Sequence, residues 1–111
     1  MSDAQRAQTE WVKDTTRAPT PTNLSDTLDA RGRRYGTFVG HAAVTQKLKR
    51  VIRGALALRA KQLDDDQLEA LEMICHKIGR IVNGDPDYAD SWVDVAGYSK
   101  LVADRLEGKV R

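Results

Sequence analysis

The segments Leu68-Glu-Ala-Leu-Glu-Met-Ile-Cys-His-Lys-Ile-Gly-Arg-Ile-Val82 and Asp90-Ser-Trp-Val-Asp-Val-Ala-Gly-Tyr98 decide the expected fold of this chain. In the first, apolar residues recur with helical spacing and form a wide stripe that includes Cys75, which we expect in the core. The acids Asp64 to Asp66 predict its start, and Asn83-Gly84 predicts its end. The second predicts a helix from Asp90 or Ser91 to about Gly108. The short turn between them makes the two helices antiparallel neighbours.

Earlier in the chain, two further helices are expected. Val44, Leu48, Val51, Ile52 and Ala55 follow the helical period and predict a helix over about 41–59. Another should begin at Asn23 or Ser25 and stop near Gly32, before a turn over 35–40. The two prolines within 15–22 predict a linker, so residues 1–22 form a flexible or short-helical tail. The expected fold is all-α, a four-helix bundle-like domain over 23–108.

Composition restricts the function classes. A chain of 111 residues has room for one domain, and no apolar run approaches the roughly 18–20 residues of a membrane span. The single cysteine, Cys75, excludes an internal disulfide and fits a cytoplasmic location. A core this small, with Gly97 in the last apolar helix, favours a homo-oligomer. No nucleophilic triad, zinc-ligand spacing or glycine-rich phosphate loop is present.

Charge is segregated along the sequence. Residues 31–63 carry nine cations and no acid, whereas residues 64–94 carry nine acids and only Lys77 and Arg80. One interpretation is two solvated faces of opposite sign that attract each other. The other is a basic surface for a phosphorylated ligand beside an acidic metal site. Nucleic acid is a possible but less favoured partner, because no recognised motif accompanies the basic stretch.

Four carboxylates are candidate Mg²⁺ ligands. Glu69 and Glu72 are i, i+3 on one expected helix, and Asp90 and Asp94 are i, i+4 on the next. Like charges repel when they gather, and a divalent cation removes this cost. The alternative interpretation makes Asp90 or Ser91 a helix cap and Asp94 the acid of a capping box. No catalytic side chain can be designated.

Cations and aromatic residues complete the predicted site. Lys77, Arg80 and Arg34 are the candidate phosphate contacts, with arginine able to bind two oxygens at once. Tyr98, Tyr35 and His76 are candidates for the base or rim of the same site. The competing interpretations are a salt bridge from Lys77 or Arg80 to Asp90 or Asp94, and ordinary packing for the aromatic residues.

Two families resemble this chain. Lys77-Ile-x-Arg80, Asp90-Ser-Trp-Val-Asp94-Val-Ala-Gly-Tyr98 and Arg34-Tyr35-Gly36 resemble an uncharacterised family of small helical proteins of tailed phages and prophages, over about residues 24–106. More loosely, the carboxylate pairs resemble those of MazG-like nucleotide pyrophosphohydrolases, although D-x3-D stands here where that family has E-x2-D. That resemblance implies Mg²⁺-dependent cleavage of nucleoside triphosphates. A non-catalytic nucleotide-binding or host-interaction protein of the same fold is the alternative.

Overall fold

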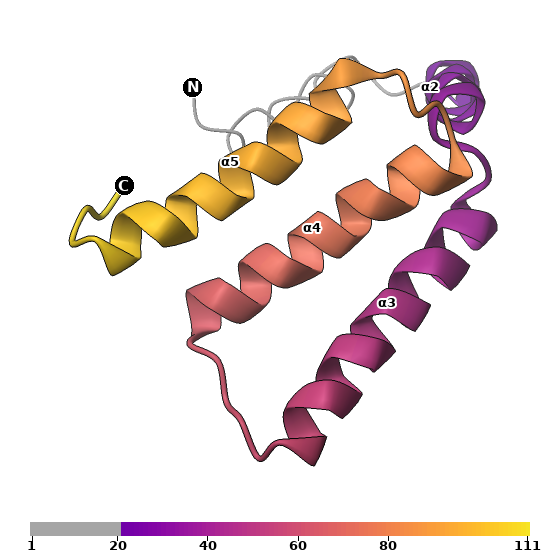
Figure 1. Cartoon of the computed structure of the whole chain (residues 1–111). Coiled ribbons are helices and arrows are strands. Elements are labelled where there is room, and N and C mark those ends of the chain that lie inside the picture. The colour runs from indigo at the N-terminus through magenta and orange to yellow at the C-terminus, as the bar shows by residue number, and fades with distance from the viewer. Residues whose placement is uncertain (1–20) are drawn as a thin grey trace.

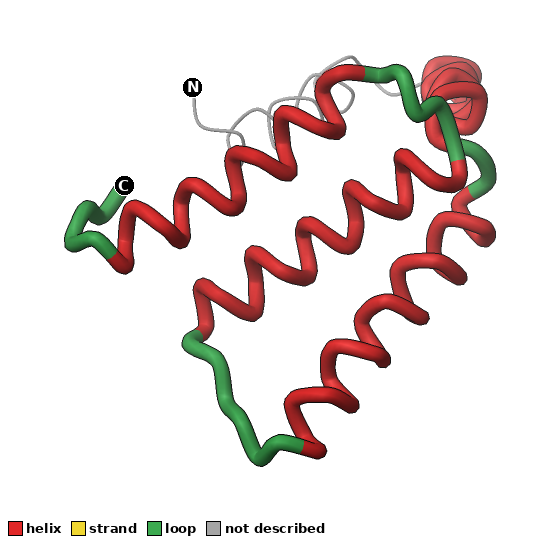
Figure 2. Tube along the Cα trace, viewed as in Figure 1, coloured by secondary structure: helices red, strands yellow, loops and turns green. Residues whose placement is uncertain are grey.

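The computed structural model describes residues 21–111, and the regular structure in this range is entirely helical. Its helices are α2 (Pro21–Tyr35), α3 (Phe38–Leu58), α4 (Asp65–Asn83) and α5 (Ala89–Leu106). Helix α4 packs against α3 on one side and α5 on the other, and α2 lies across one end of this layer (Figure 1). Short loops join the helices (Figure 2). The predicted all-α class is confirmed.

The first described helix differs from its prediction at both ends. It begins at Pro21, where a proline suits the first helical position because its missing N–H has no helical acceptor. It continues through Gly32 to Tyr35, because Gly36 and not Gly32 adopts the positive φ (77°) that ends a helix. Residues 1–20 lie outside the described range, and with them nearly all of the predicted tail.

Side chains at the N-termini explain where α3 and α4 begin. The hydroxyl of Thr37 accepts a hydrogen bond from the backbone N–H of Gly40 (3.1 Å), so α3 begins at Phe38, three residues earlier than predicted. The side chain of Gln67 accepts from the backbone N–H of Asp64 (2.9 Å) and fixes the start of α4. Helix α4 matches its prediction within one residue at each end.

Helix α5 contradicts the prediction that Asp90 or Ser91 caps it. Tyr88 occupies the N-cap position, and Ser91 is buried within the first turn. The indole N–H of Trp92 donates to the carbonyl oxygen of Pro86 (2.8 Å) and ties the helix to the preceding turn. The capping-box role predicted for Asp94 is therefore wrong as well.

The fully buried side chains are mainly polar. Among residues 23–111 the buried hydrophobic residues are only Tyr35, Ala70, Cys75 and Tyr98, which confirms Cys75 as a core residue. The buried polar residues are His41, Thr45, Lys77, Arg80, Ser91, Asp94 and Asp104. Helical spacing would place Trp92, Val95, Ala96, Val102 and Leu106 of α5 in the core, but only Val95 and Val102 are half-buried, and the other three are exposed. An ion pair between α4 and α5, described below, accompanies this rotation of the helix.

No helix between residues 21 and 111 combines the length and the apolar character needed to cross a membrane.

Candidate functional site

A pocket of about 420 Å³ lies where α2, α3 and α4 meet. Its volume is within the range of small-molecule sites, and most of its lining is apolar. The exposed side chains of Leu28 and Phe38 form part of its rim. The polar groups that reach it are the side chains of Arg31, His41, His76 and Arg80.

Hydrogen bonds to the backbone join distant segments of the chain at this pocket. The side-chain amide of Asn83, at the end of α4, donates to the carbonyl oxygens of Tyr35 and Thr37 (2.9 Å each). The N–H of Asp85 donates to the carbonyl oxygen of Arg34 (2.7 Å). These bonds hold the α2–α3 loop against the α4–α5 turn. A glycine is needed at position 84 because a side chain there would collide with the backbone of Arg34 and Tyr35, and not for a positive φ, since its φ is −126°.

Two histidines pair inside the pocket. His41 Nε2 lies 3.1 Å from His76 Nδ1, and the rings meet edge to face with centroids 4.5 Å apart. One of these nitrogens donates and the other accepts. The other ring nitrogen of His41, Nδ1, is buried without a hydrogen-bond partner. The pair therefore retains unused hydrogen-bonding capacity.

The histidines are neutral at pH 7. Burial, and after it the charge of Arg80, lowers the pKa of His76 from 6.5 to about 3. Burial first and Arg80 second also lower the pKa of His41. The positive surroundings mean that an anion beside Arg80 would favour protonation of the pair.

Arg80 is the one buried arginine of the described residues. It is 8 % exposed, its guanidinium carbon lies 4.2 Å from the ring centroid of Tyr35, and it lines the pocket. None of the ion pairs among residues 21–111 includes it. A buried cation is normally paired with an anion, because removing it from water is costly.

Lys77, predicted beside Arg80, lies in a different environment. Its Nζ forms an ion pair with Asp94 Oδ2 at 2.9 Å between α4 and α5, and the two side chains are 2 % and 7 % exposed. This contact corresponds to the competing interpretation of Lys77, a salt bridge across the α4–α5 hairpin. Lys77 is therefore a structural partner of Asp94, and only Arg80 of the two lines the pocket.

The four predicted metal ligands are dispersed. Asp94 pairs with Lys77, and Glu72 pairs with Arg53 on α3 at 2.7 Å. Asp90 accepts a hydrogen bond from the Tyr88 hydroxyl (3.1 Å), and Glu69 is exposed. Within the described range no three His, Cys, Asp or Glu side chains come together in a way that could hold a metal ion. The Mg²⁺ site stays a prediction that this arrangement does not support.

The remaining candidates divide between the pocket and other places. Tyr35 and His76 line the pocket with Arg80. Tyr98 is buried on α5. Arg34 is exposed, its guanidinium lies 4.3 Å from the Tyr88 ring centroid, and it donates to the Tyr88 hydroxyl (3.3 Å). Sequence reasoning missed His41, whose partner His76 lies on another helix.

No protein-family model, curated protein or solved structure matches this chain. The resemblances to the phage family and to the MazG-like enzymes therefore stay predictions, and function is argued from the pocket itself.

Proposed function

We propose that this protein binds a phosphorylated small molecule of the nucleoside phosphate class in the pocket between α2, α3 and α4. The observation that carries the proposal is Arg80, a buried arginine beside the pocket that pairs with no carboxylate of the described residues. A phosphate group would supply the missing counter-charge, and a guanidinium can bind two of its oxygens.

The rest of the pocket suits the other half of such a ligand. Phe38 is 80 % exposed at the rim, and Leu28 is 55 % exposed beside it. Apolar and aromatic side chains at a pocket rim favour a flat aromatic group over bulk water, because stacking removes apolar surface from solvent. A nucleoside phosphate combines such a group with an anion.

Binding without hydrolysis fits the geometry better than Mg²⁺-dependent pyrophosphohydrolysis. Metal-assisted cleavage requires carboxylates that are free to hold the ion. Lys77 and Arg53 already neutralise Asp94 and Glu72, and these two acids belong to different pairings on opposite sides of α4. We therefore favour the binding protein over the enzyme.

Calorimetric titration with ATP and, separately, with inorganic phosphate tests this proposal. Arg80→Met should weaken both ligands by about tenfold to a hundredfold, since a charge-assisted contact is lost. Phe38→Ala should weaken ATP only. Arg53→Met, which removes an arginine paired with Glu72 outside the pocket, is the matched control and should leave both affinities within twofold. Equal ATP affinity in Arg80→Met and the parent chain would refute the site.

We also propose that the protein self-associates. Eleven large hydrophobic side chains between residues 24 and 110 are exposed, several more than half, whereas no leucine, isoleucine or valine in residues 23–111 is fully buried. Exposed apolar surface of this extent is typical of chains that bury it against a partner. Light scattering of the purified protein at about 100 µM, near the range of weak dimers, tests it.

A further inference from the structure

Helix α5 carries a regular row of exposed residues, here named the α5 stripe. Its members, separated alternately by three and four positions, are Ala89, Trp92, Ala96, Ser99, Ala103, Leu106 and, just beyond the helix, Val110. All seven are exposed, including Trp92 at 56 % and Leu106 at 59 %. Alternating spacings of three and four place residues along one side of a helix and are the signature of pairing with a second helix.

The stripe is not the face that α5 uses within its own chain. Towards α4 the helix buries Ser91, Asp94 and Tyr98, with Asp94 paired to Lys77. Val95, Leu101 and Val102 are half-buried, whereas the stripe, with Trp92 and Leu106, stays exposed. A row of apolar residues on the surface of a helix is typical of a contact with a partner.

The central part of the stripe, from Trp92 to Leu106, has large side chains at its two ends and small ones between them. Trp92 and Leu106 each lie seven residues from Ser99, and Ala96 and Ala103 lie three and four residues from it. An antiparallel second copy centred on Ser99 would set Trp92 against the partner's Leu106 and small residues against small ones. Small residues at the centre let two helices approach closely, and large ones close the ends.

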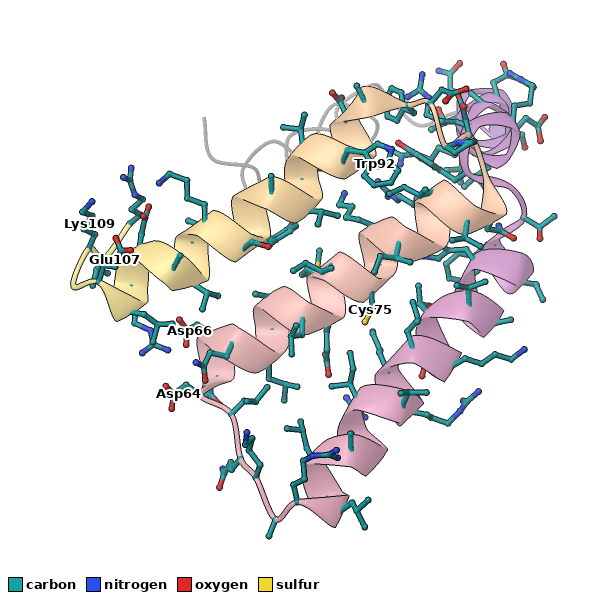
Figure 3. The ribbon with its side chains drawn as sticks, viewed as in Figure 1. Asp64, Asp66, Cys75, Trp92, Glu107 and Lys109 are labelled. Carbon is teal, nitrogen blue, oxygen red and sulfur yellow. The ribbon has the colours of Figure 1, made fainter. Side chains whose placement is uncertain are left out.

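Charge also favours the antiparallel direction. Asp85 and Asp87 are exposed just before α5. Just after it Lys109 is exposed, next to Glu107, and Arg111 is paired with Asp104 of its own chain (2.6 Å). Trp92 and Lys109 mark the two ends of the helix in Figure 3. Antiparallel pairing brings the acids of one copy beside the cations of the other, whereas parallel pairing brings like charges together.

We propose that two copies of this chain pair through the α5 stripe, antiparallel, with Ser99 at the two-fold axis. The inference rests on the proposed self-association and specifies its surface, direction and register. It is independent of ligand binding, because the pocket is formed by α2, α3 and α4.

The surface is tested by sedimentation of Ala96→Glu. A glutamate at this position blocks the close approach of the two helices and would bury a charge. The dissociation constant of the dimer should therefore increase at least tenfold. Leu58→Glu is the matched control, because Leu58 is 84 % exposed on α3, and it should leave dissociation unchanged. Both positions are exposed, so both variants should remain helical, which circular dichroism checks. A monomeric parent protein refutes self-association and this inference together. A parent dimer that Ala96→Glu leaves intact refutes only the α5 surface.

Register is tested by paired charges and by cross-linking. Trp92→Lys and Leu106→Glu should each weaken the dimer, and the double variant should recover affinity, because each lysine would face the partner's glutamate. Ser99→Cys should be joined across the axis by a short bifunctional thiol reagent, and Leu58→Cys should not. Cys75 is buried and does not compete. Additive losses in the double variant, or equal cross-linking at Leu58→Cys, would refute the register.

Discussion

Two cations about one turn apart on α4, Lys77 and Arg80, differ in their surroundings. Lys77 is enclosed between α4 and α5, 2.9 Å from Asp94, whereas Arg80 is buried against Tyr35 at the pocket and has no carboxylate partner among the described residues. Side chains three residues apart on a helix point in directions that differ by roughly 60° around its axis, which is enough to place them in two different interfaces. The position of each cation around the helix therefore decides which interface it enters and which groups it meets.

The largest effect should come from breaking the ion pair between Lys77 and Asp94. Lys77→Met leaves the Asp94 carboxylate buried without its cation, so the free energy of unfolding should fall by about 3–5 kcal/mol. The matched variant Arg80→Met leaves no buried charge behind and should change it by less than about 1 kcal/mol. Urea denaturation measures both.

Removing both partners provides the control for this difference. Lys77→Met combined with Asp94→Leu should recover most of the lost stability, because no unpaired charge remains. Equal losses for Lys77→Met and Arg80→Met would show that the two cations have equivalent surroundings, which would contradict the comparison.

The pocket itself depends on the bonds from Asn83. Asn83→Ala removes two hydrogen bonds to the α2–α3 loop and should lower the free energy of unfolding by about 1–3 kcal/mol. Thr27→Ala, which removes only a bond to the carbonyl oxygen of Asn23 on the exposed side of α2, should cost less than about 0.5 kcal/mol. Similar values for both variants would mean that Asn83 does not hold the pocket together.

The free energy of unfolding should decrease as the pH is lowered, because of the histidine pair. The pKa of His76 is lowered from 6.5 to about 3, so below pH 6.5 the unfolded chain binds a proton that the native chain does not. The free energy of unfolding therefore has its full value above pH 6.5 and decreases progressively as the pH falls towards 3. The slope should approach about 1.4 kcal/mol per pH unit for one histidine.

Denaturation between pH 7 and 5 measures this slope. His76→Gln should flatten it, and saturating phosphate should also reduce it, because a bound anion favours the protonated pair. A parent protein with the same stability at pH 7 and pH 5 would contradict the burial of the pair. Lowering the pH should leave the affinity of Arg80→Met for phosphate nearly unchanged.

The smallest effect is expected from Mg²⁺ alone. A ligand that binds only the native state raises stability by RT ln(1 + [L]/Kd), and here two of the four predicted ligands already have cationic partners. The melting temperature should therefore shift by less than about 1 °C in millimolar Mg²⁺. A larger increase that Glu72→Gln and Asp94→Asn abolish would restore the metal site and the hydrolase interpretation.

Local sequence was sufficient for the helices. Periodic apolar residues placed α3, α4 and α5 within a few residues, and the acids of the Asp64–Asp66 run marked the start of α4 because they suit a helix N-terminus. The ends of α2 were less well predicted, since Gly32 and Gly36 are equally plausible stops in sequence. In the structure Gly36 has the positive φ and lies against Asn83, where a side chain would collide, whereas a side chain at Gly32 would meet nothing.

Parts of the candidate site were also foreseen. Arg80, Tyr35 and His76 were predicted as ligand contacts from their residue types, and the structure brings all three to one pocket. Lys77 and Asp94 were predicted for the same site but belong to the α4–α5 interface. His41 was missed, because its partner His76 lies 35 positions away in sequence and no local pattern connects them.

Residue types and their spacing were enough to predict that this chain is helical, where α3, α4 and α5 lie, and which side chains are able to hold an anion. The side of each helix that faces inward depends on contacts between helices. Helical period is a property of neighbouring residues, whereas the rotation of α5 about its axis follows from Asp94 meeting Lys77, a contact between helices. With this rotation α5 buries Ser91 and Asp94 and exposes Trp92 and Leu106.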